Sequence, residues 1–110
     1  MLIKLGEHDI GTITAYVNPY HRIADMGILM GDKHAWNKGY GAEAWKCVMD
    51  WLWKLDAPLI RKIECGTMQD NRGMRKIASK CGMDCEAVRP GHFLLEGHPQ
   101  ALAMYGKFRS

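Results

Sequence analysis

The sequence contains no run of about 18 apolar residues, the length that a helix needs to cross a membrane. Residues 1–7 also lack the long apolar core of a secretory signal peptide. Neither feature indicates a membrane or secretory route. We therefore expect a cytoplasmic protein that does not bind membranes.

A large excess of charge is also missing, because 15 basic residues face 12 acidic ones and the net charge is only +3. That excess is too small to indicate a nucleic-acid-binding protein, although a local basic patch would suffice for a small anionic ligand. Hydrophobic residues make up 47% of the chain and charged residues 25%, which favours a folded core over disorder. The length predicts one domain, residues 1–110.

The four cysteines include no C-x-x-C pair. Cys47 and Cys65 have apolar neighbours, so we expect both to be buried, reduced thiols. Cys81 and Cys85 could form a redox or metal pair, but no histidine lies near them in the sequence. We therefore expect no metal.

Hydrophobic alternation predicts strands at 2–5, 10–17 and 23–30, which would form an antiparallel meander. Gly27 lies inside the third strand and predicts a bulge or a close backbone approach there. The period then changes to 3.6, and an amphipathic helix is expected over residues 42–55. Four apolar residues are expected to form its buried face: Trp45, Val48, Leu52 and Leu55.

The second half of the chain continues with a strand at 61–67 and a helix at 71–81. Asp70 or Asn71 can cap that helix, and Gly82 ends it. Shorter strands are expected at three further positions: 86–89, 92–96 and 100–105, with a turn at 97–99. This order predicts an α+β fold with a mixed sheet, in which residues 23–67 form a right-handed strand–helix–strand crossover.

Two glycines, Gly39 and Gly41, stand where the third strand gives way to the first helix. Glycine allows a ligand to approach the backbone closely, and a helix amino terminus directs free N–H groups at an anion. The pattern favours a pyrophosphate cradle at 37–42, with an ordinary glycine-rich loop as the alternative. Neither a Walker loop nor a complete dinucleotide fingerprint is present.

The residues around these glycines resemble a known family. Residues 27–32 and 36–44 read Gly-Ile-Leu-Met-Gly-Asp and Trp-Asn-Lys-Gly-Tyr-Gly-Ala-Glu-Ala, and they look like the acetyl-CoA loop of the GNAT superfamily of N-acetyltransferases, Q/R-x-x-G-x-G/A. Residues 70–83 and Tyr105-Gly106 are similar to the subgroup that includes the ribosomal-protein N-terminal acetyltransferases. The resemblance covers nearly the whole chain from about residue 10 and implies a GNAT-like, mostly antiparallel mixed sheet with two main helices.

The resemblance implies transfer of the acetyl group of acetyl-CoA to a primary amine by direct attack, the acceptor being a protein N-terminus, a small amine or an amino sugar. It also implies a set of cofactor-binding residues on the third strand, in the glycine loop and on the second helix. These are Ile28, Leu29, Met30, Trp36, Asn37, Lys38, Gly39, Tyr40, Gly41, Ala42, Asn71, Arg75 and Lys76.

Catalysis would require a base for the amine and an acid for the thiolate. Asp25, in the strand before Gly27, is our first candidate for the base, with His92 and His21 as second choices. Tyr105 is the candidate acid. A surface carboxylate and a core tyrosine are the simpler explanations of Asp25 and Tyr105.

Several residues depart from the family pattern. The strand and two helices that normally precede the meander, and form one wall of the acceptor site, are not in this sequence, and Ala78 occupies the slot of a frequent tyrosine. The alternative function is therefore a CoA-binding or interaction module without turnover, or a subunit completed by a partner. An open sheet edge, together with Met26, Met30 and Trp53, favours a homodimer.

Overall fold

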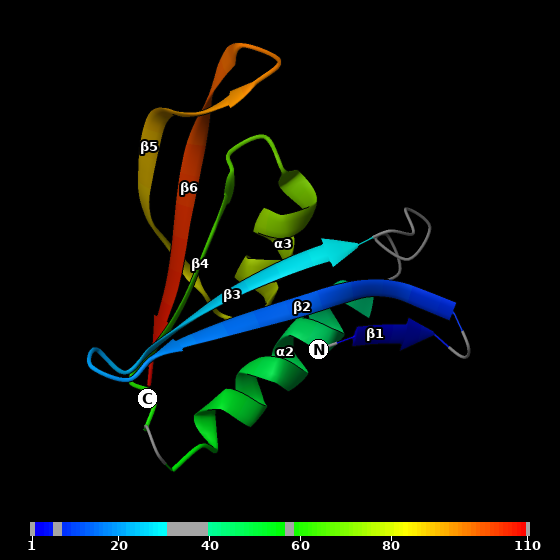
Figure 1. Ribbon diagram of the computed structural model, residues 1–110, viewed down its shortest axis with the longest axis vertical. Helices are drawn as coiled ribbons and strands as arrows, with labels where there is room; N and C mark the ends of the chain where they lie inside the picture. Colours follow the sequence, from blue (N-terminus) through cyan, green and yellow to red (C-terminus); the bar gives the residue numbers. More distant parts are fainter. Residues whose placement is uncertain (1, 6–7, 31–39, 57–58, 110) are drawn as a thin grey trace.

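The computed structural model describes the backbone of residues 2–5, 8–30, 40–56 and 59–109. Its elements follow the expected order of three strands, a helix, a strand, a helix and two strands (Figure 1). Their bounds are β1 Leu2–Leu5, β2 His8–Asn18, β3 Ile23–Met30, α2 Tyr40–Trp53, β4 Lys62–Met68, α3 Arg72–Lys80, β5 Asp84–Leu95 and β6 His98–Phe108.

The strands form one sheet in the order β1-β2-β3-β4-β6-β5. Every neighbouring pair is antiparallel except β3 and β4, which are parallel because α2 carries the chain from one to the other. The prediction of an α+β fold with a mixed, mostly antiparallel sheet and two main helices is confirmed.

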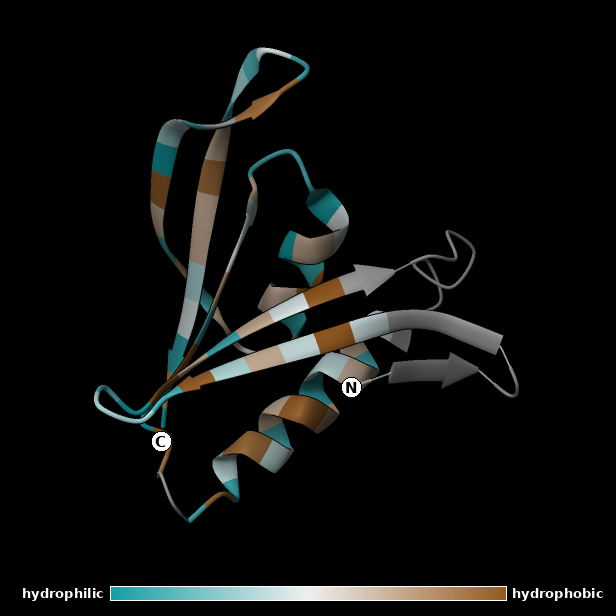
Figure 2. Ribbon diagram, viewed as in Figure 1, coloured by the Kyte–Doolittle hydropathy of each residue, from teal (hydrophilic) through white to brown (hydrophobic). Residues whose placement is uncertain are grey.

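Both helices pack on the same face of the sheet. The buried cluster joins Trp45, Val48 and Leu52 of α2 with Met74 and Ala78 of α3 and with alternate residues of the central strands. Figure 2 shows the corresponding alternation of apolar and polar residues along β2 and β3. Burial of each large apolar side chain stabilises the fold by about 1.5–3 kcal/mol. The opposite face carries no helix of the described residues, and we call it the open face.

The predicted bulge at Gly27 is wrong. The β2–β3 register runs without a break from Gly11 opposite Met30 to Asn18 opposite Ile23, and Gly27 pairs with Thr14. A Cβ at Gly27 would lie 3.1 Å from the Thr14 hydroxyl oxygen. The glycine therefore accommodates a cross-strand side chain and leaves the ladder regular.

The two C-terminal strands, β5 and β6, also differ from the prediction. The predicted strands 86–89 and 92–96 are one strand, β5, interrupted by two register shifts. The turn consists of Glu96 and Gly97, with φ of 50° and 80°, and His98 and Pro99 already pair in β6. Two successive left-handed residues are typical of a tight hairpin turn. The hairpin extends beyond the other strands of the sheet (Figure 1).

Some predictions for single residues of the helices and strands are confirmed, and one is wrong. Asn71 caps α3, because its Oδ1 accepts the Met74 N–H at 3.1 Å, and Gly82 ends that helix with a φ of +81°. Cys65 is buried as expected, but Cys47 is exposed because it lies on the solvent side of α2. No helix of the described residues is long and apolar enough to cross a membrane.

Two of the residues on which the homodimer prediction was based do not form an open surface. Met26 is only 2% exposed and packs in the core beneath β3, so it offers no surface to a partner. Trp53 packs against the same core and lies 5.1 Å from the Arg109 guanidinium. The homodimer therefore has to be argued from other residues.

Candidate functional site

The sheet opens between β3 and β4. Their parallel pairing in the described residues covers Ile23, Ala24 and Asp25 opposite Lys62, Ile63 and Glu64, after which β3 runs on to Met30 and β4 to Met68. Figure 1 shows the two strands diverging from that point. Beyond Asp25 the β4-facing edge of β3 has no strand partner among the described residues, and such a backbone edge can bind an extended ligand. Ile28, Leu29 and Met30, which the resemblance assigned to the cofactor, lie on this stretch.

Two carboxylates occupy the point of divergence. Asp25 and Glu64 are register partners on adjacent strands, so their side chains share a face of the sheet. Because Ala24 and Ile63 beside them are buried under the helices, this shared face is the open one. Burial raises the pKa of Asp25 above its ordinary value. The acid that the sequence singled out thus has a neighbour, Glu64, that it did not.

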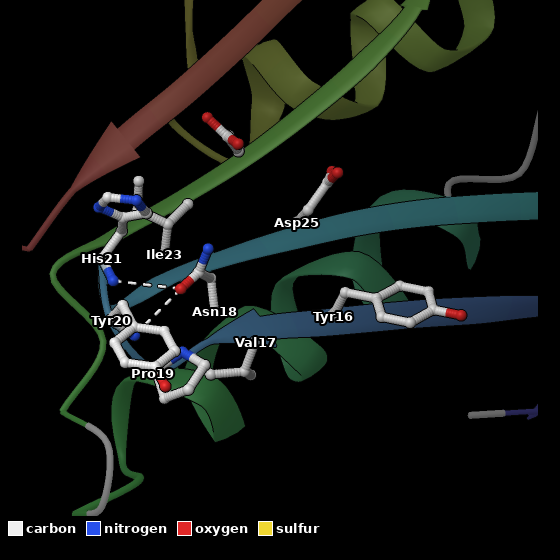
Figure 3. A pocket seen from close by; sticks show the side chains of 9 residues that line it. Tyr16, Val17, Asn18, Pro19, Tyr20, His21, Ile23 and Asp25 are labelled. Carbon is white, nitrogen blue, oxygen red and sulfur yellow. Dashed lines mark hydrogen bonds between the residues drawn. The ribbon is translucent and has the colours of Figure 1, made fainter.

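A cavity of about 590 Å³ lies beside these carboxylates on the open face (Figure 3). The residues that line it come from β2, the β2–β3 turn, β3 and β4: Tyr16, Val17, Asn18, Pro19, Tyr20, His21, Ile23, Asp25 and Glu64. Asn18 holds the turn, since its Oδ1 accepts the N–H groups of Tyr20 at 3.0 Å and His21 at 3.2 Å. The cavity is therefore a shaped recess with two acids at one end and aromatic rings along its sides.

A second recess of about 380 Å³ is lined by Thr12, Thr14, Gly27 and Ile28. Its β3 residues follow Asp25 towards the end of the strand. The two recesses thus run from the carboxylates along β2 and β3, towards the part of β3 for which the described strands provide no partner on the β4 side.

The candidate acid, Tyr105, lies on the opposite side of the sheet from Asp25. It pairs with Cys65 on the core face and is buried, and its hydroxyl accepts the Arg75 Nε–H at 2.9 Å. Arg75 also donates to the Gln69 carbonyl at 3.2 Å, and the bond to Tyr105 raises the pKa of the guanidinium. Arg75, which the family resemblance assigned to the cofactor, thus contacts β6 through its Nε–H, and its cofactor role stays a prediction.

The predicted phosphate cradle is only partly within the described residues. Trp36, Asn37, Lys38 and Gly39 lie outside them, while α2 begins at Tyr40 and carries Gly41 and Ala42 in its first turn. The first turn of α2, whose N–H groups have no acceptor within the helix itself, thus lies at the end of the predicted cradle.

Gly41 has a local packing reason of its own. A Cβ at this position would lie 2.9 Å from Ile77 Cδ1 and 3.9 Å from Ile28 Cδ1. The missing side chain lets the first turn of α2 pack closely against α3 and β3. No sequence pattern indicates this contact, because it joins three elements that are distant along the chain.

The remaining candidates are separated from one another. Asn71 precedes α3 and uses its side-chain Oδ1 to cap the helix, whereas Lys76 lies on α3 and is exposed. His21 lines the cavity, whereas His92 lies on the β5–β6 hairpin and lines neither recess. Within the described residues no group of three His, Cys, Asp or Glu is placed to hold a metal ion.

Comparison with known proteins gives one family match. The model of the acetyltransferase (GNAT) domain matches residues 1–84. No curated protein matches the sequence.

Solved structures share the fold. A ribosomal-protein-S5-alanine acetyltransferase from Vibrio fischeri superimposes with a TM-score of 0.81 at 17% identity, over 94% of this chain and 56% of that one. A variant spermidine N-acetyltransferase from Vibrio cholerae gives 0.82 at 18%, over 96% and 61%. A microcin C7 self-immunity acetyltransferase in complex with acetyl-CoA and AMP gives 0.79 at 20%, over 92% and 55%. This chain thus spans little more than half the length of those proteins.

Proposed function

We propose, from the premise that this chain belongs to the GNAT acetyltransferase family, that it binds acetyl-CoA and transfers the acetyl group to a primary amine in the cytoplasm. The observation that carries the proposal is the divergence of β3 and β4 with Asp25 at its apex. A backbone edge without a strand partner and a carboxylate beside a cavity are what a linear thioester and an attacking amine require.

The cofactor side of this proposal uses the helix-covered face and the β3 edge. The main chain of Ile28, Leu29 and Met30 would bind the amides of the pantetheine arm, and the N–H groups at the start of α2 would bind the pyrophosphate. Asn71 and Lys76, near the start of α3, would contact the outer parts of the cofactor. Trp36, Asn37, Lys38 and Gly39 keep the roles that the sequence resemblance implies.

The acceptor side uses the open face. An amine is nucleophilic only when neutral, so Asp25 would take the proton that the nitrogen loses as it attacks the thioester carbon. The raised pKa makes Asp25 a better base than an ordinary aspartate. The carbon–sulfur bond then breaks, and the departing thiolate takes a proton.

Tyr105 is the proposed source of that last proton. Its oxygen accepts the bond from Arg75, so its own O–H is not consumed by that contact. Tyr105 and Asp25 lie on opposite faces of neighbouring parts of the sheet, which suits a reaction whose two substrates meet at the divergence.

Acetyl transfer to a panel of amines, followed by the mass of the product, tests the proposal. Asp25→Asn should lower kcat by at least about 100-fold while CoA binding, measured by calorimetry, persists. Asp50→Asn is the matched control, because it removes an exposed carboxylate from α2 on the other side of the sheet. Full activity in folded Asp25→Asn would remove Asp25 from the mechanism.

One observation favours the second candidate function, a CoA-binding module without turnover. Ala78, which replaces a frequent family tyrosine, is completely buried in the core. No hydroxyl is therefore supplied from that position of α3. Calorimetric binding of CoA, with no product from any amine, would select this alternative.

A homodimer is the proposed assembly. The outer strand β5 exposes Val88, Leu94 and Leu95, and such apolar residues on an edge strand favour association. Light scattering should give about twice the chain mass of 12.5 kDa at micromolar concentration. A mass of one chain, independent of concentration, would contradict the dimer.

A further inference from the structure

The second recess, of about 380 Å³, lies on the open face over Gly27. Thr12 and Thr14, which line it, belong to that face because Ile13 between them is buried in the core. Gly27 is the register partner of Thr14, so the position where its side chain would stand is on the same face. The recess therefore lies where a glycine of β3 stands beside the threonines of β2.

The missing side chain of Gly27 keeps this recess open. A Cβ at position 27 would lie 3.1 Å from Thr14 Oγ1, closer than a Cβ ordinarily approaches a neighbouring atom. The β2–β3 register is regular here, so no bulge accounts for the glycine. Any side chain at position 27 would therefore fill part of the recess.

Gly27 also lies where the proposed function places the thioester. In that proposal the pantetheine amides bind to the main chain of residues 28–30, and the attacked carbon faces Asp25. Met26 and Gly27 are the two residues of β3 between these points. The thioester, and the acyl group that it carries, therefore lie beside Met26 and Gly27.

The two sides of the sheet offer unequal space at this point. On the helix-covered side Met26 is 2% exposed, and Ala24 and Cys65 are buried with it in the core. On the open side Gly27 contributes no side chain, and the recess begins there. An acyl group longer than acetyl is therefore accommodated towards the open face.

We propose that the second recess binds the acyl group of the thioester, and that the chain accepts, besides acetyl, acyl groups of roughly three to five carbons. A methylene group is about as large as a water molecule, which takes about 30 Å³ of liquid, so about 380 Å³ holds several of them. The inference rests on the proposed function and leaves its bond changes as they are. The amine nitrogen bonds to the acyl carbon, Asp25 takes the amine proton, the carbon–sulfur bond breaks, and the thiolate takes a proton.

Calorimetry without an amine compares CoA, acetyl-CoA and butyryl-CoA. Removing two further methylene groups from water should make butyryl-CoA bind at least about fivefold more tightly than acetyl-CoA. In Gly27→Ala this preference should fall at least about threefold, because the new methyl group occupies the recess. Free CoA has no acyl group, so its affinity should be the same in parent and variant, which also shows that the variant is folded.

A second variant tests the contact itself. Thr14→Ala removes the hydroxyl oxygen that a Cβ at position 27 would meet, so adding it to Gly27→Ala should restore most of the preference for butyryl-CoA. Transfer is then measured on an amine that accepts acetyl. The kcat/KM for butyryl-CoA should be at least equal to that for acetyl-CoA in the parent, and it should fall in Gly27→Ala.

Equal affinity of acetyl-CoA and butyryl-CoA for the parent overturns the inference, as does a preference that Gly27→Ala leaves unchanged. In both cases the binding of CoA leaves the proposed function standing. Transfer confined to acetyl overturns the use of longer acyl groups as substrates. If none of the three CoA compounds binds, the proposed function fails, and this inference fails with it.

Discussion

Replacing Gly41 by alanine tests what this glycine does. The added Cβ would lie 2.9 Å from Ile77 Cδ1, whereas ordinary carbon contacts begin near 3.4 Å. The end of the isoleucine side chain must rotate away, which costs about 0.5–1.5 kcal/mol. Alanine in a helix gains about 0.5–1 kcal/mol over glycine. We therefore expect the free energy of unfolding to change by less than about 1 kcal/mol in Gly41→Ala alone.

The contact becomes visible in a double-mutant cycle. Ile77→Val removes the Cδ1 atom in question and by itself costs about 0.5–1.5 kcal/mol. In that background the alanine methyl fills the vacated space, so Gly41→Ala should then stabilise the protein. The coupling free energy between the two substitutions should be about 1 kcal/mol in favour of the double variant. Urea unfolding of the four proteins, followed by tryptophan fluorescence, supplies the values.

Calorimetry of CoA binding on the same four proteins separates packing from ligand approach. The Cβ points at Ile77 and Ile28, so the double variant should bind CoA within about threefold of the parent through an unchanged backbone N–H. A tenfold loss of CoA affinity in a double variant that has regained stability would refute this reasoning. It would restore the sequence-based hypothesis that the glycine makes room for phosphate. A coupling near zero would show that position 41 does not meet Ile77.

Three further predictions follow from single residues. With a pKa of about 12, only about one part in ten thousand of the Cys65 thiol should be thiolate at pH 8, so Cys65 should react with a thiol reagent only after unfolding. The exposed Cys47 and Cys85 should react in the native protein, and mass spectrometry of labelled peptides distinguishes the three sites. Because burial raises the pKa of Asp25 above 3.8, the native state holds that proton more tightly than the unfolded chain, and stability falls as pH rises from 3.8 through the native pKa. Asp25→Asn should therefore be more stable than the parent at pH 7 and lose that advantage at about pH 3 in urea titrations; an equal advantage at both pH values contradicts the assigned burial. Asn71→Ala removes the cap of α3 and should cost about 1 kcal/mol in the same titration, while Asn71→Asp should retain most of that stability.

Local patterns in the sequence were sufficient for most of the fold. Alternation placed β3 at its observed bounds, and the run from Asn71 to Gly82 predicted both ends of α3 because caps and left-handed glycines are decided within a few residues. Cys47 was misplaced for an equally local reason. Its neighbours in sequence are apolar, but two positions along a helix is about 200°, which turns it away from Trp45 and the core.

The candidate site could be predicted only in part. Asp25 was identified from its own strand, but the partnership with Glu64 depends on the register of a parallel pair whose strands are joined through a helix. The same distance along the chain hides the contact of Gly41 with Ile77 and the bond between Arg75 and Tyr105. Each of these interactions joins elements whose relative placement is set by the core, and no short motif encodes it.

The β3–β4 ladder is short, and we call this junction between the two halves of the sheet the seam. Three register pairs of the described residues join the half made of β1, β2 and β3 to the half made of β4, β6 and β5. Beyond that seam the helices lie behind both halves, and a Cβ at position 41 would lie 3.9 Å from Ile28 Cδ1 of β3 and 2.9 Å from Ile77 Cδ1 of α3. The size of the side chain at position 41 therefore affects the distance between α3 and β3. A larger residue there would press α3 and β3 apart, and a series of substitutions of increasing volume would report how far these two elements can separate before the fold loses stability.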